Sequence, residues 1–313
     1  MKICTLKDID KPLTITLGSF DGIHLGHIDL IDHLKRKADE TGSKSAIITF
    51  KPHPREVVNP DYDIRYITTW SEKIELLERT GIDFLIVQEF NREIMKTDPT
   101  VFIRDYILAN VEVKHFVSGF NHHFGKDRKG GFLDLEKLGK EFSFNVSSVP
   151  PRMLNNKPIS STIIRQSVLS WDGNVDSYLG RFFFIDGVVV HGKKRGRTIN
   201  FPTINLLPEN PKKMRPEVGV YFTAVKLDGV FYFSMTNIGY NPTFEEGKKT
   251  IESYILNYND YCYDKKLRLY FILRLRDEIK FDGIESLTDQ LIIDKNRAIN
   301  LTKGINFEDP RFI

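Results

Sequence analysis

The sequence predicts two different folds in one chain: an α/β domain with a parallel sheet, followed by a small antiparallel β-barrel. In the first half, short apolar runs alternate with stretches of helical spacing, which is the order of a parallel sheet with helices on both faces. After residue 181 the pattern changes to closely spaced apolar runs with turn signals between them, which is typical of a small closed barrel. A length of 313 residues suits two separate cores. We therefore predict one domain at residues 1–181 and another at 182–313.

Composition and charge limit the classes of protein to consider. The net charge is only +3, so the chain as a whole is not built to bind a polyanion, although residues 193–197 form one local basic cluster. Cys4 and Cys262 are far apart in the sequence, which argues against a disulfide scaffold and favours a reducing compartment. No window approaches the roughly 18 apolar residues of a membrane span, and the N-terminus lacks an apolar signal region. We expect a cytoplasmic protein that binds neither membranes nor nucleic acid.

The elements expected in the first half follow from apolar spacing. Residues 13–17 alternate apolar side chains with threonine and predict a buried strand, while helical spacing begins at Ile28. An apolar run bounded by Gly42 and Pro52 predicts a second strand at 45–50. Beyond it, helices are expected at 71–80 and 99–109, and strands at 83–87 and 115–118. This alternation predicts a Rossmann-like sheet, whose ligands bind at the carboxyl ends of the strands.

The most specific stretch of the chain is the turn after the first strand, Leu-Gly-Ser-Phe-Asp-Gly-Ile-His-Leu-Gly-His at residues 17–27. Gly18 and Gly22 allow the backbone to approach a ligand, and the helix start offers unpaired N–H groups and a positive dipole end. His24 and His27 would lie side by side on the first helical turn, where both could donate to the oxygens of a triphosphate. Two histidines at this spacing also fit an ordinary helix surface, and a zinc site would need further ligands.

Three further segments of the first half place polar groups at strand or helix ends. His53 follows the strand at 45–50, where parallel sheets bind ligands. Residues 119–131 contain four glycines and two histidines after another strand, a pattern that an ordinary surface loop also has. At 159–165 the string Ile-Ser-Ser-Thr-Ile-Ile-Arg begins a helix with Ser160 or Ser161 as N-cap. Arg165 then projects about one turn later, where its planar fork suits a phosphate, although a surface arginine is the plainer interpretation.

Together these strings resemble a known family. The pattern G-x-F-D-G-x-H-x-G-H is similar to the signature of nucleotidyltransferases with an HxGH motif. Its F-D-G form resembles bacterial bifunctional FAD synthetase, in which riboflavin kinase is fused to FMN adenylyltransferase. The resemblance implies that His24, His27 and Arg165 stabilise charge on the phosphates during adenylylation. It also implies that Asn121 holds ribose or phosphate and that Phe124 packs on the flavin ring. The other nucleotide- or flavin-binding residues that it implies are Gly18, Phe20, Asp21, Gly22, His53, Ser161 and Thr162.

The second half contains five expected strands and a final helix. Apolar runs predict strands at 183–191, 221–227, 230–237, 251–257 and 267–274. Asp228-Gly229 is a strong hairpin signal between two of them. The pattern at 284–301 predicts a terminal helix that packs Leu287, Leu291 and Ala298 on the barrel. After the first of these strands, residues 192–198 form a basic glycine loop that lacks the spacing of a Walker A motif.

The strings of the second half resemble riboflavin kinase. Four strings occur in the same order as in that family. They are a loop with Gly192, Gly196 and Arg197, Phe-Pro-Thr-Ile-Asn at 201–205, Asn-Ile-Gly-Tyr-Asn-Pro-Thr-Phe at 237–244, and a strand that contains the acid Glu252. The resemblance implies that the loop binds ATP phosphates. Thr203 and Asn205 offer neutral oxygen ligands that suit Mg²⁺ shared with ATP. Glu252 could take the proton from the ribityl hydroxyl, although alone it would be an ordinary strand carboxylate. Asn200 stands at a glycine position of the family, so we expect it in the left-handed conformation.

The predicted function is bifunctional: phosphorylation of riboflavin to FMN with ATP and Mg²⁺, then adenylylation of FMN by a second ATP to FAD, with release of pyrophosphate. One alternative is a nucleotidyltransferase for another phosphate ester, which the fused barrel disfavours because such enzymes are usually the α/β domain alone. Another is a flavin-binding or regulatory homologue that has lost one or both activities. The intact residues His24, His27, Thr203, Asn205 and Glu252 argue against it. We expect a monomer or a weak homo-oligomer.

Overall fold

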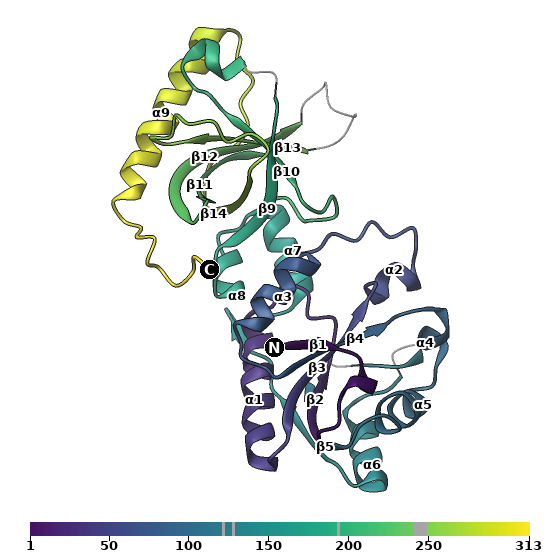
Figure 1. Cartoon of the computed structure of the whole chain (residues 1–313). Coiled ribbons are helices and arrows are strands. Elements are labelled where there is room, and N and C mark those ends of the chain that lie inside the picture. The colour runs from purple at the N-terminus through teal and green to yellow at the C-terminus, as the bar shows by residue number, and fades with distance from the viewer. Residues whose placement is uncertain (121–122, 127–128, 193–194, 241–248) are drawn as a thin grey trace. The chain divides into compact units, whose positions relative to one another are not determined.

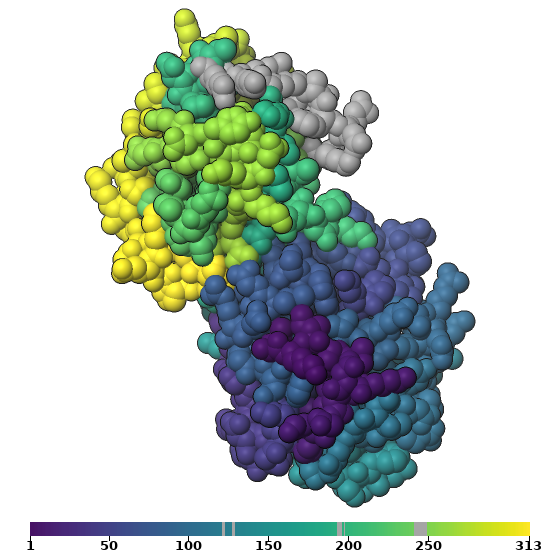
Figure 2. All heavy atoms as spheres, in the orientation of Figure 1, coloured from purple at the N-terminus to yellow at the C-terminus, as the bar shows by residue number. Residues whose placement is uncertain are grey.

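The computed structural model describes residues 1–120, 123–126, 129–192, 195–240 and 249–313. These residues form two compact units, 1–161 and 162–313, each with its own sheet (Figures 1 and 2). The first unit holds a parallel sheet with helices and the second a closed antiparallel barrel with a terminal helix, so the predicted fold class is confirmed. Thr162–Ser170 of α7 (Ser161–Ser170) and all of α8 (Val175–Leu179) belong to the compact unit of the barrel. A functional boundary at residue 181 stays a prediction.

The first unit is built on a six-stranded sheet with the order β1-β4-β3-β2-β5-β6, in which all neighbouring strands are parallel (Figure 1). The strands are β1 (Lys2–Cys4), β2 (Leu13–Leu17), β3 (Lys44–Lys51), β4 (Phe84–Glu89), β5 (Val113–Gly119) and β6 (Asn145–Val149). From β2 the chain moves one way through β3 and β4, and later the other way through β5 and β6. Ligands of such sheets bind at this reversal, beyond the carboxyl ends of the strands.

Helices cover both faces of this sheet, which is why all five residues of β2 are buried. α1 (Leu25–Thr41) contacts β2, β3 and β5, and it buries Leu30, Ile31, Leu34 and Ala38. Alternate residues of β2 share a second core with side chains of segment 94–107 and of α6 (Phe132–Phe142). The other elements are η1 (Leu6–Asp8), α2 (Pro54–Val58), α3 (Trp70–Glu78), α4 (Arg92–Lys96), α5 (Pro99–Val101), the π-helical η2 (Phe102–Leu108), β7 (Met153–Leu154) and β8 (Lys157–Pro158). The helix expected at 99–109 is therefore one α-helical turn that continues as a π-helix.

The second unit is a closed barrel with the strand order β10-β13-β12-β11-β14-β9, in which β9 also pairs with β10. Its strands are β9 (Phe183–Val190), β10 (Ile204–Pro208), β11 (Gly219–Leu227), β12 (Val230–Tyr240), β13 (Lys249–Ile255) and β14 (Lys266–Arg276), and the 3₁₀ turn η4 (Arg195–Ile199) precedes β10. The hairpin expected at Asp228-Gly229 joins β11 to β12. Both turn residues have positive φ angles, 50° and 82°, as a type I′ turn requires.

The terminal helix α9 (Ile284–Thr302) packs on the outside of the barrel (Figure 1). Leu291 and Ala298 share a core cluster with Phe222 and Met235 of the barrel strands, which confirms two of the three predicted helix contacts. Several isoleucines of α9 are exposed: Ile284, Ile292, Ile293 and Ile299.

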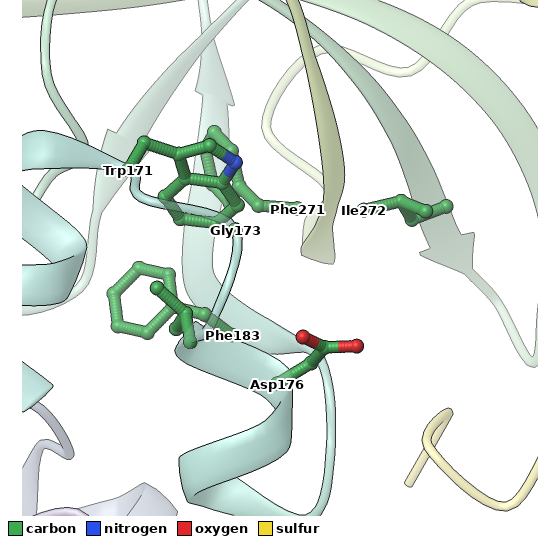
Figure 3. A pocket seen from close by; sticks show the side chains of 7 residues that line it. Trp171, Gly173, Asp176, Phe183, Phe271 and Ile272 are labelled. Atoms are coloured by element: carbon green, nitrogen blue, oxygen red, sulfur yellow. The ribbon is translucent and has the colours of Figure 1, made fainter. Parts of the chain in front are cut away.

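The segment between α7 and α8 is fixed to the barrel by Trp171. Its ring meets Tyr221 edge-on with centroids 5.3 Å apart, and Phe271 lies 5.7 Å away. Trp171 also lines a pocket with Asp176 and Phe183 (Figure 3). The volume of this pocket is about 20 Å³, room for about one water molecule and far too little for any of the expected substrates. The pocket is therefore a feature of packing rather than a substrate site.

Candidate active sites

The turn between β2 and α1 has a strained backbone. Phe20 and Ile23 have φ angles of 47° and 36°, and Gly22 has a φ of 96°. An L-residue in the left-handed region costs about 1–2 kcal/mol, and such conformations persist where the surrounding structure holds them in place. At Gly18 an added Cβ would lie 3.1 Å from the Phe20 ring. The predicted glycines therefore allow a tight, closely packed turn.

His24 and His27 lie side by side, as the sequence predicts. His24 is the N-cap of α1, and its Nδ1 accepts a hydrogen bond from the backbone N–H of His27 at 3.3 Å. The two rings are stacked with centroids 3.7 Å apart and an interplanar angle of 16°. Because Nδ1 of His24 accepts, the hydrogen of the neutral ring is on Nε2. The pair is thus fixed at the positive end of the α1 dipole.

Asp21 is buried in the turn, and its expected role in ligand binding stays a prediction. Its carboxylate is 1% exposed and accepts hydrogen bonds from the backbone N–H groups of Thr68 at 3.0 Å and Ile67 at 3.3 Å. The Thr68 hydroxyl donates to the same carboxylate and accepts from the N–H of Gly22 at 2.9 Å. The carboxylate oxygens of Asp21 thus accept hydrogen bonds from groups inside the protein. Asp21 therefore ties the turn to the segment before α3.

His53 and Phe124 are expected to contact ligands, and these roles stay predictions. His53 follows β3 as the N-cap of α2, and its Nδ1 accepts from the N–H of Arg55 at 3.2 Å. In the loop after β5, Phe124 is only 5% exposed and packs in the core with α6. Phe120, at the start of this loop, is 45% exposed. Asn121 lies outside the described residues.

The segment at 159–165 connects to the glycine turn through its serine. The Ser161 hydroxyl donates to the backbone carbonyl of Asp21 at 2.8 Å, and Ser161 is the first residue of α7. Thr162 and Arg165 lie further along α7, in the second compact unit. Their roles in phosphate binding stay predictions.

In the barrel, three polar residues form a row across adjacent strands. Glu252 of β13 is directly opposite Asn205 of β10 on one side and Asn237 of β12 on the other. Directly opposed residues of antiparallel strands lie on the same face, with Cβ atoms about 4.5–5.5 Å apart. The register therefore brings one carboxylate and two amides together. We call Asn205, Glu252 and Asn237 the polar row.

Two glycines of the loop beside the polar row, Gly192 and Gly196, are closely packed. A Cβ at Gly192 would lie 2.0 Å from Nδ2 of Asn205, and one at Gly196 would lie 2.1 Å from the carbonyl oxygen of Phe201. The Asn205 amide therefore lies directly over the start of the loop. Asn200 has a φ of 59°, the left-handed conformation that the sequence predicts. The side chain of Arg197 lies outside what the structure describes.

Mg²⁺ binding by Thr203 and Asn205 stays a prediction, which their spacing allows. Thr203 is two residues from Asn205, the spacing that puts two side chains on one face of an extended chain. Among the described residues, no three His, Cys, Asp or Glu side chains form a metal-binding group. Thr and Asn oxygens would leave most of an octahedral shell to ATP and water, which is the usual way that proteins hold Mg²⁺.

Comparison with known proteins assigns both units. A family model described as FAD synthetase matches residues 6–163, and one described as riboflavin kinase matches residues 179–302. A bifunctional riboflavin kinase/FMN adenylyltransferase of Listeria monocytogenes is 35% identical, with 92% of this chain and 91% of the relative covered. One of Bacillus subtilis is 36% identical, with 94% of each chain covered. This chain belongs to the bifunctional riboflavin kinase/FMN adenylyltransferase family.

A solved structure has the same overall fold as this member of the bifunctional family. It comes from Streptococcus pneumoniae and is named a macrolide-efflux protein; it is 30% identical, with a TM-score of 0.86, and the match covers 95% of this chain and 97% of that one. In the described part of the present chain, no helix is long and apolar enough to cross a membrane.

The family matches divide the two sites between the units. The FAD synthetase match contains the turn with His24 and His27, and the riboflavin kinase match contains the polar row. Two residues that contact the turn, Thr68 and Lys73, carried no sequence signal because they are 46 and 54 positions away from their partners. Asn237 belongs to the family string at 237–244, but the sequence assigned it no role. The strand register places it opposite Glu252 in the polar row.

Proposed function

We propose that this chain carries both activities named for its family, phosphorylation of riboflavin to FMN and adenylylation of FMN to FAD, each with ATP. The observation that carries the proposal is that one chain holds both sets of groups. The polar row gives a carboxylate between two amides, and the start of α1 gives two stacked imidazoles. The first set suits the activation of a hydroxyl group, and the second suits the binding of phosphate oxygens.

In the kinase step, Glu252 takes the proton from the ribityl 5′-hydroxyl. The hydroxyl oxygen attacks the γ-phosphorus of ATP while the bond from that phosphorus to the bridging oxygen of ADP breaks, which gives FMN and ADP. Thr203 and Asn205 would hold Mg²⁺, which supplies positive charge to the transferring phosphates. Asn237 is directly opposite Glu252 on β12 and would orient its carboxylate. The backbone N–H groups of the glycine loop bind the phosphates of ATP.

In the adenylylation step, the protein supplies charge and alignment rather than a nucleophile. A phosphate oxygen of FMN attacks the α-phosphorus of a second ATP, the bond to the β-phosphate oxygen breaks, and pyrophosphate leaves. His24 donates from Nε2, and His27 and the first N–H groups of α1 add donors where negative charge builds up. Arg165 adds a further cation, a role that rests on its motif.

We also propose a cytoplasmic location and a monomeric or weakly associating chain. Cys4 and Cys262 are both free and buried, which supports a reducing compartment.

The test is chromatography of the products that the purified full chain forms from riboflavin, ATP and Mg²⁺. FMN followed by FAD is the expected result. FMN alone would restrict the function to the kinase, and FAD only from added FMN would restrict it to the adenylyltransferase. A yellow protein that forms neither product would favour a flavin-binding homologue. Transfer of a nucleotide to phosphopantetheine or glycerol phosphate instead of FMN would favour a different nucleotidyltransferase.

A further inference from the structure

Lys73 is a buried lysine that neither proposed reaction uses. It lies in the first turn of α3, is 6% exposed, and donates from Nζ to the backbone carbonyl of Ser19 at 2.6 Å. A charged ammonium is costly to bury unless it is paired. The negative charge of Asp21, in the same turn as Ser19, favours the charged form of Lys73 and raises its pKa against the effect of burial. A buried cation therefore lies beside the predicted polyphosphate site.

Lys73 completes a set of contacts around the strained turn. We call Asp21, Thr68 and Lys73 the turn clamp. Asp21 and Thr68 hold the turn after Phe20, through the N–H of Gly22 and the backbone before α3. Lys73 holds it before Phe20, through the carbonyl of Ser19. The left-handed Phe20 is thus fixed from both sides, as a strained functional turn requires.

The bond from Lys73 also sets the direction of a backbone donor. The carbonyl of Ser19 and the N–H of Phe20 belong to one planar trans peptide, so they point in opposite directions. With the carbonyl held by Lys73, the N–H of Phe20 is directed away from Lys73. Within the described ranges, no acceptor is recorded for this N–H, although the Phe20 side chain is 2% exposed. A buried backbone donor without a protein acceptor is a place for a ligand oxygen.

We infer that Lys73 is a positioning residue of the adenylyltransferase site. Its ammonium fixes the peptide between Ser19 and Phe20, aims the N–H of Phe20 at a phosphate oxygen, and adds a fixed positive charge beneath the turn. The inference rests on the proposed adenylylation of FMN. It adds a residue from α3, an element in which the sequence places no part of the site.

The test compares Lys73→Met with a matched lysine of the same unit. Lys35 donates from Nζ to the backbone carbonyl of Thr80 at 2.7 Å, a bond of the same type that does not involve the turn. Lys73→Met should lower the rate of FAD formation from FMN by about tenfold to hundredfold, because a hydrogen bond to a charged group is lost. Lys35→Met should leave that rate within about twofold. Both variants should form FMN from riboflavin at the wild-type rate, which shows that the barrel unit is intact, and thermal unfolding monitored at Trp70 checks that the first unit is folded.

Lys73→Arg separates charge from mere packing through the pH profile. Burial lowers the pKa of the Lys73 ammonium, and the Asp21 carboxylate opposes this shift. Lys51 is a second cation on this side, because its Nζ lies 4.9 Å from the same Trp70 ring that Lys73 contacts, and Glu72 is a buried carboxylate of the same helix. Wild-type adenylylation should therefore decline at alkaline pH as Lys73 loses its proton. Lys73→Arg should retain most of the rate and move this alkaline limit upward, since a guanidinium stays charged.

The outcomes distinguish the inference from the function on which it rests. If wild type forms FAD, but Lys73→Met behaves like Lys35→Met or Lys73→Arg keeps the wild-type alkaline limit, the inference is wrong. If wild type forms no FAD from FMN, the proposed function itself fails. If Lys73→Met does not fold, the alkaline limit of Lys73→Arg decides the question alone.

Discussion

The two sites of this chain are built in opposite ways. In the barrel, Glu252 and its two amide neighbours stand on regular strands, and the ladder register alone brings them together. In the first unit, the histidines follow a turn with several positive φ angles. This turn is held by the side chains of Thr68 and Lys73, which are about 50 residues further along the chain. A substitution in the polar row should therefore change the chemistry and little else. A substitution near the turn should act through both the chemistry and the backbone that carries it.

The largest effect is expected for Glu252→Gln. The amide has the same shape but cannot accept the proton of the ribityl hydroxyl, so FMN formation should fall by about 10³-fold. FAD formation from added FMN should stay at the wild-type rate, because the histidines are untouched. Chromatography of both reactions measures this, with Glu209→Gln as control, since Glu209 pairs with Lys266 on the barrel surface at 3.0 Å. Equal loss of both reactions would contradict the separation of the sites.

His24→Ala should have the next largest effect, a loss of about 10²- to 10³-fold in FAD formation from FMN with normal FMN formation from riboflavin. His24→Asn sharpens the comparison, because asparagine can replace the N-cap acceptor of His24 but not its Nε2 donor. Both variants should lose the same activity, whereas only the alanine variant should lose about 1 kcal/mol of stability. Thermal unfolding together with the rate assay measures the two effects. Recovery of activity in His24→Asn would show that His24 acts only as a cap.

A smaller effect is expected for Asn237, the residue that the strand register adds to the polar row. Asn237→Ala should lower FMN formation by about tenfold, since Glu252 loses a neighbour that orients it. Asn237→Asp puts a second carboxylate beside Glu252 and should raise the pKa of that base. The acid limit of the kinase should then move to higher pH. An unchanged pH profile in Asn237→Asp would mean that the two side chains do not interact.

The sequence predicts the regular parts of both sites and misses the parts that depend on tertiary contacts. The side-by-side placement of His24 and His27 follows from helical spacing, whereas the facing of Asn205 and Glu252 depends on β10, where no strand was expected. A match to a sequence motif does not show whether a side chain faces the ligand or the protein interior. Asp21 and Phe124 fit the family strings, yet one is hydrogen-bonded inside the protein and the other packs in the core. The edge strands β1 and β6 were also missed, because β1 is short and β6 carries few apolar residues.

The smallest effect is expected in the response of stability to acid. Burial lowers the pKa of His33 and of His115, whose Nε2 atoms lie 3.1 Å and 2.8 Å from the Ser147 hydroxyl. The unfolded histidines bind protons near pH 6.5, so the unfolded state binds more protons below that pH and stability falls as the solution is acidified. Of the 8 histidines only His191 follows residue 161, so the first unit should lose more stability than the barrel.

The two tryptophans allow each unit to be followed separately, because Trp70 lies in the first unit and Trp171 in the second. Denaturant unfolding of Trp171→Phe and Trp70→Phe at pH 7.5 and 5.5 measures the difference. An equal loss in both units would contradict the assignment of the effect to His33 and His115.

The central claim is that one chain holds two independent sites linked by free FMN. The most direct measurement mixes two purified variants, Glu252→Gln and His24→Asn, with riboflavin, ATP and Mg²⁺, and follows the products by chromatography. The account predicts that the mixture forms FAD, because the second variant releases FMN and the first adenylylates it, while neither variant alone forms FAD from riboflavin. Accumulation of FMN without FAD in the mixture would contradict the claim.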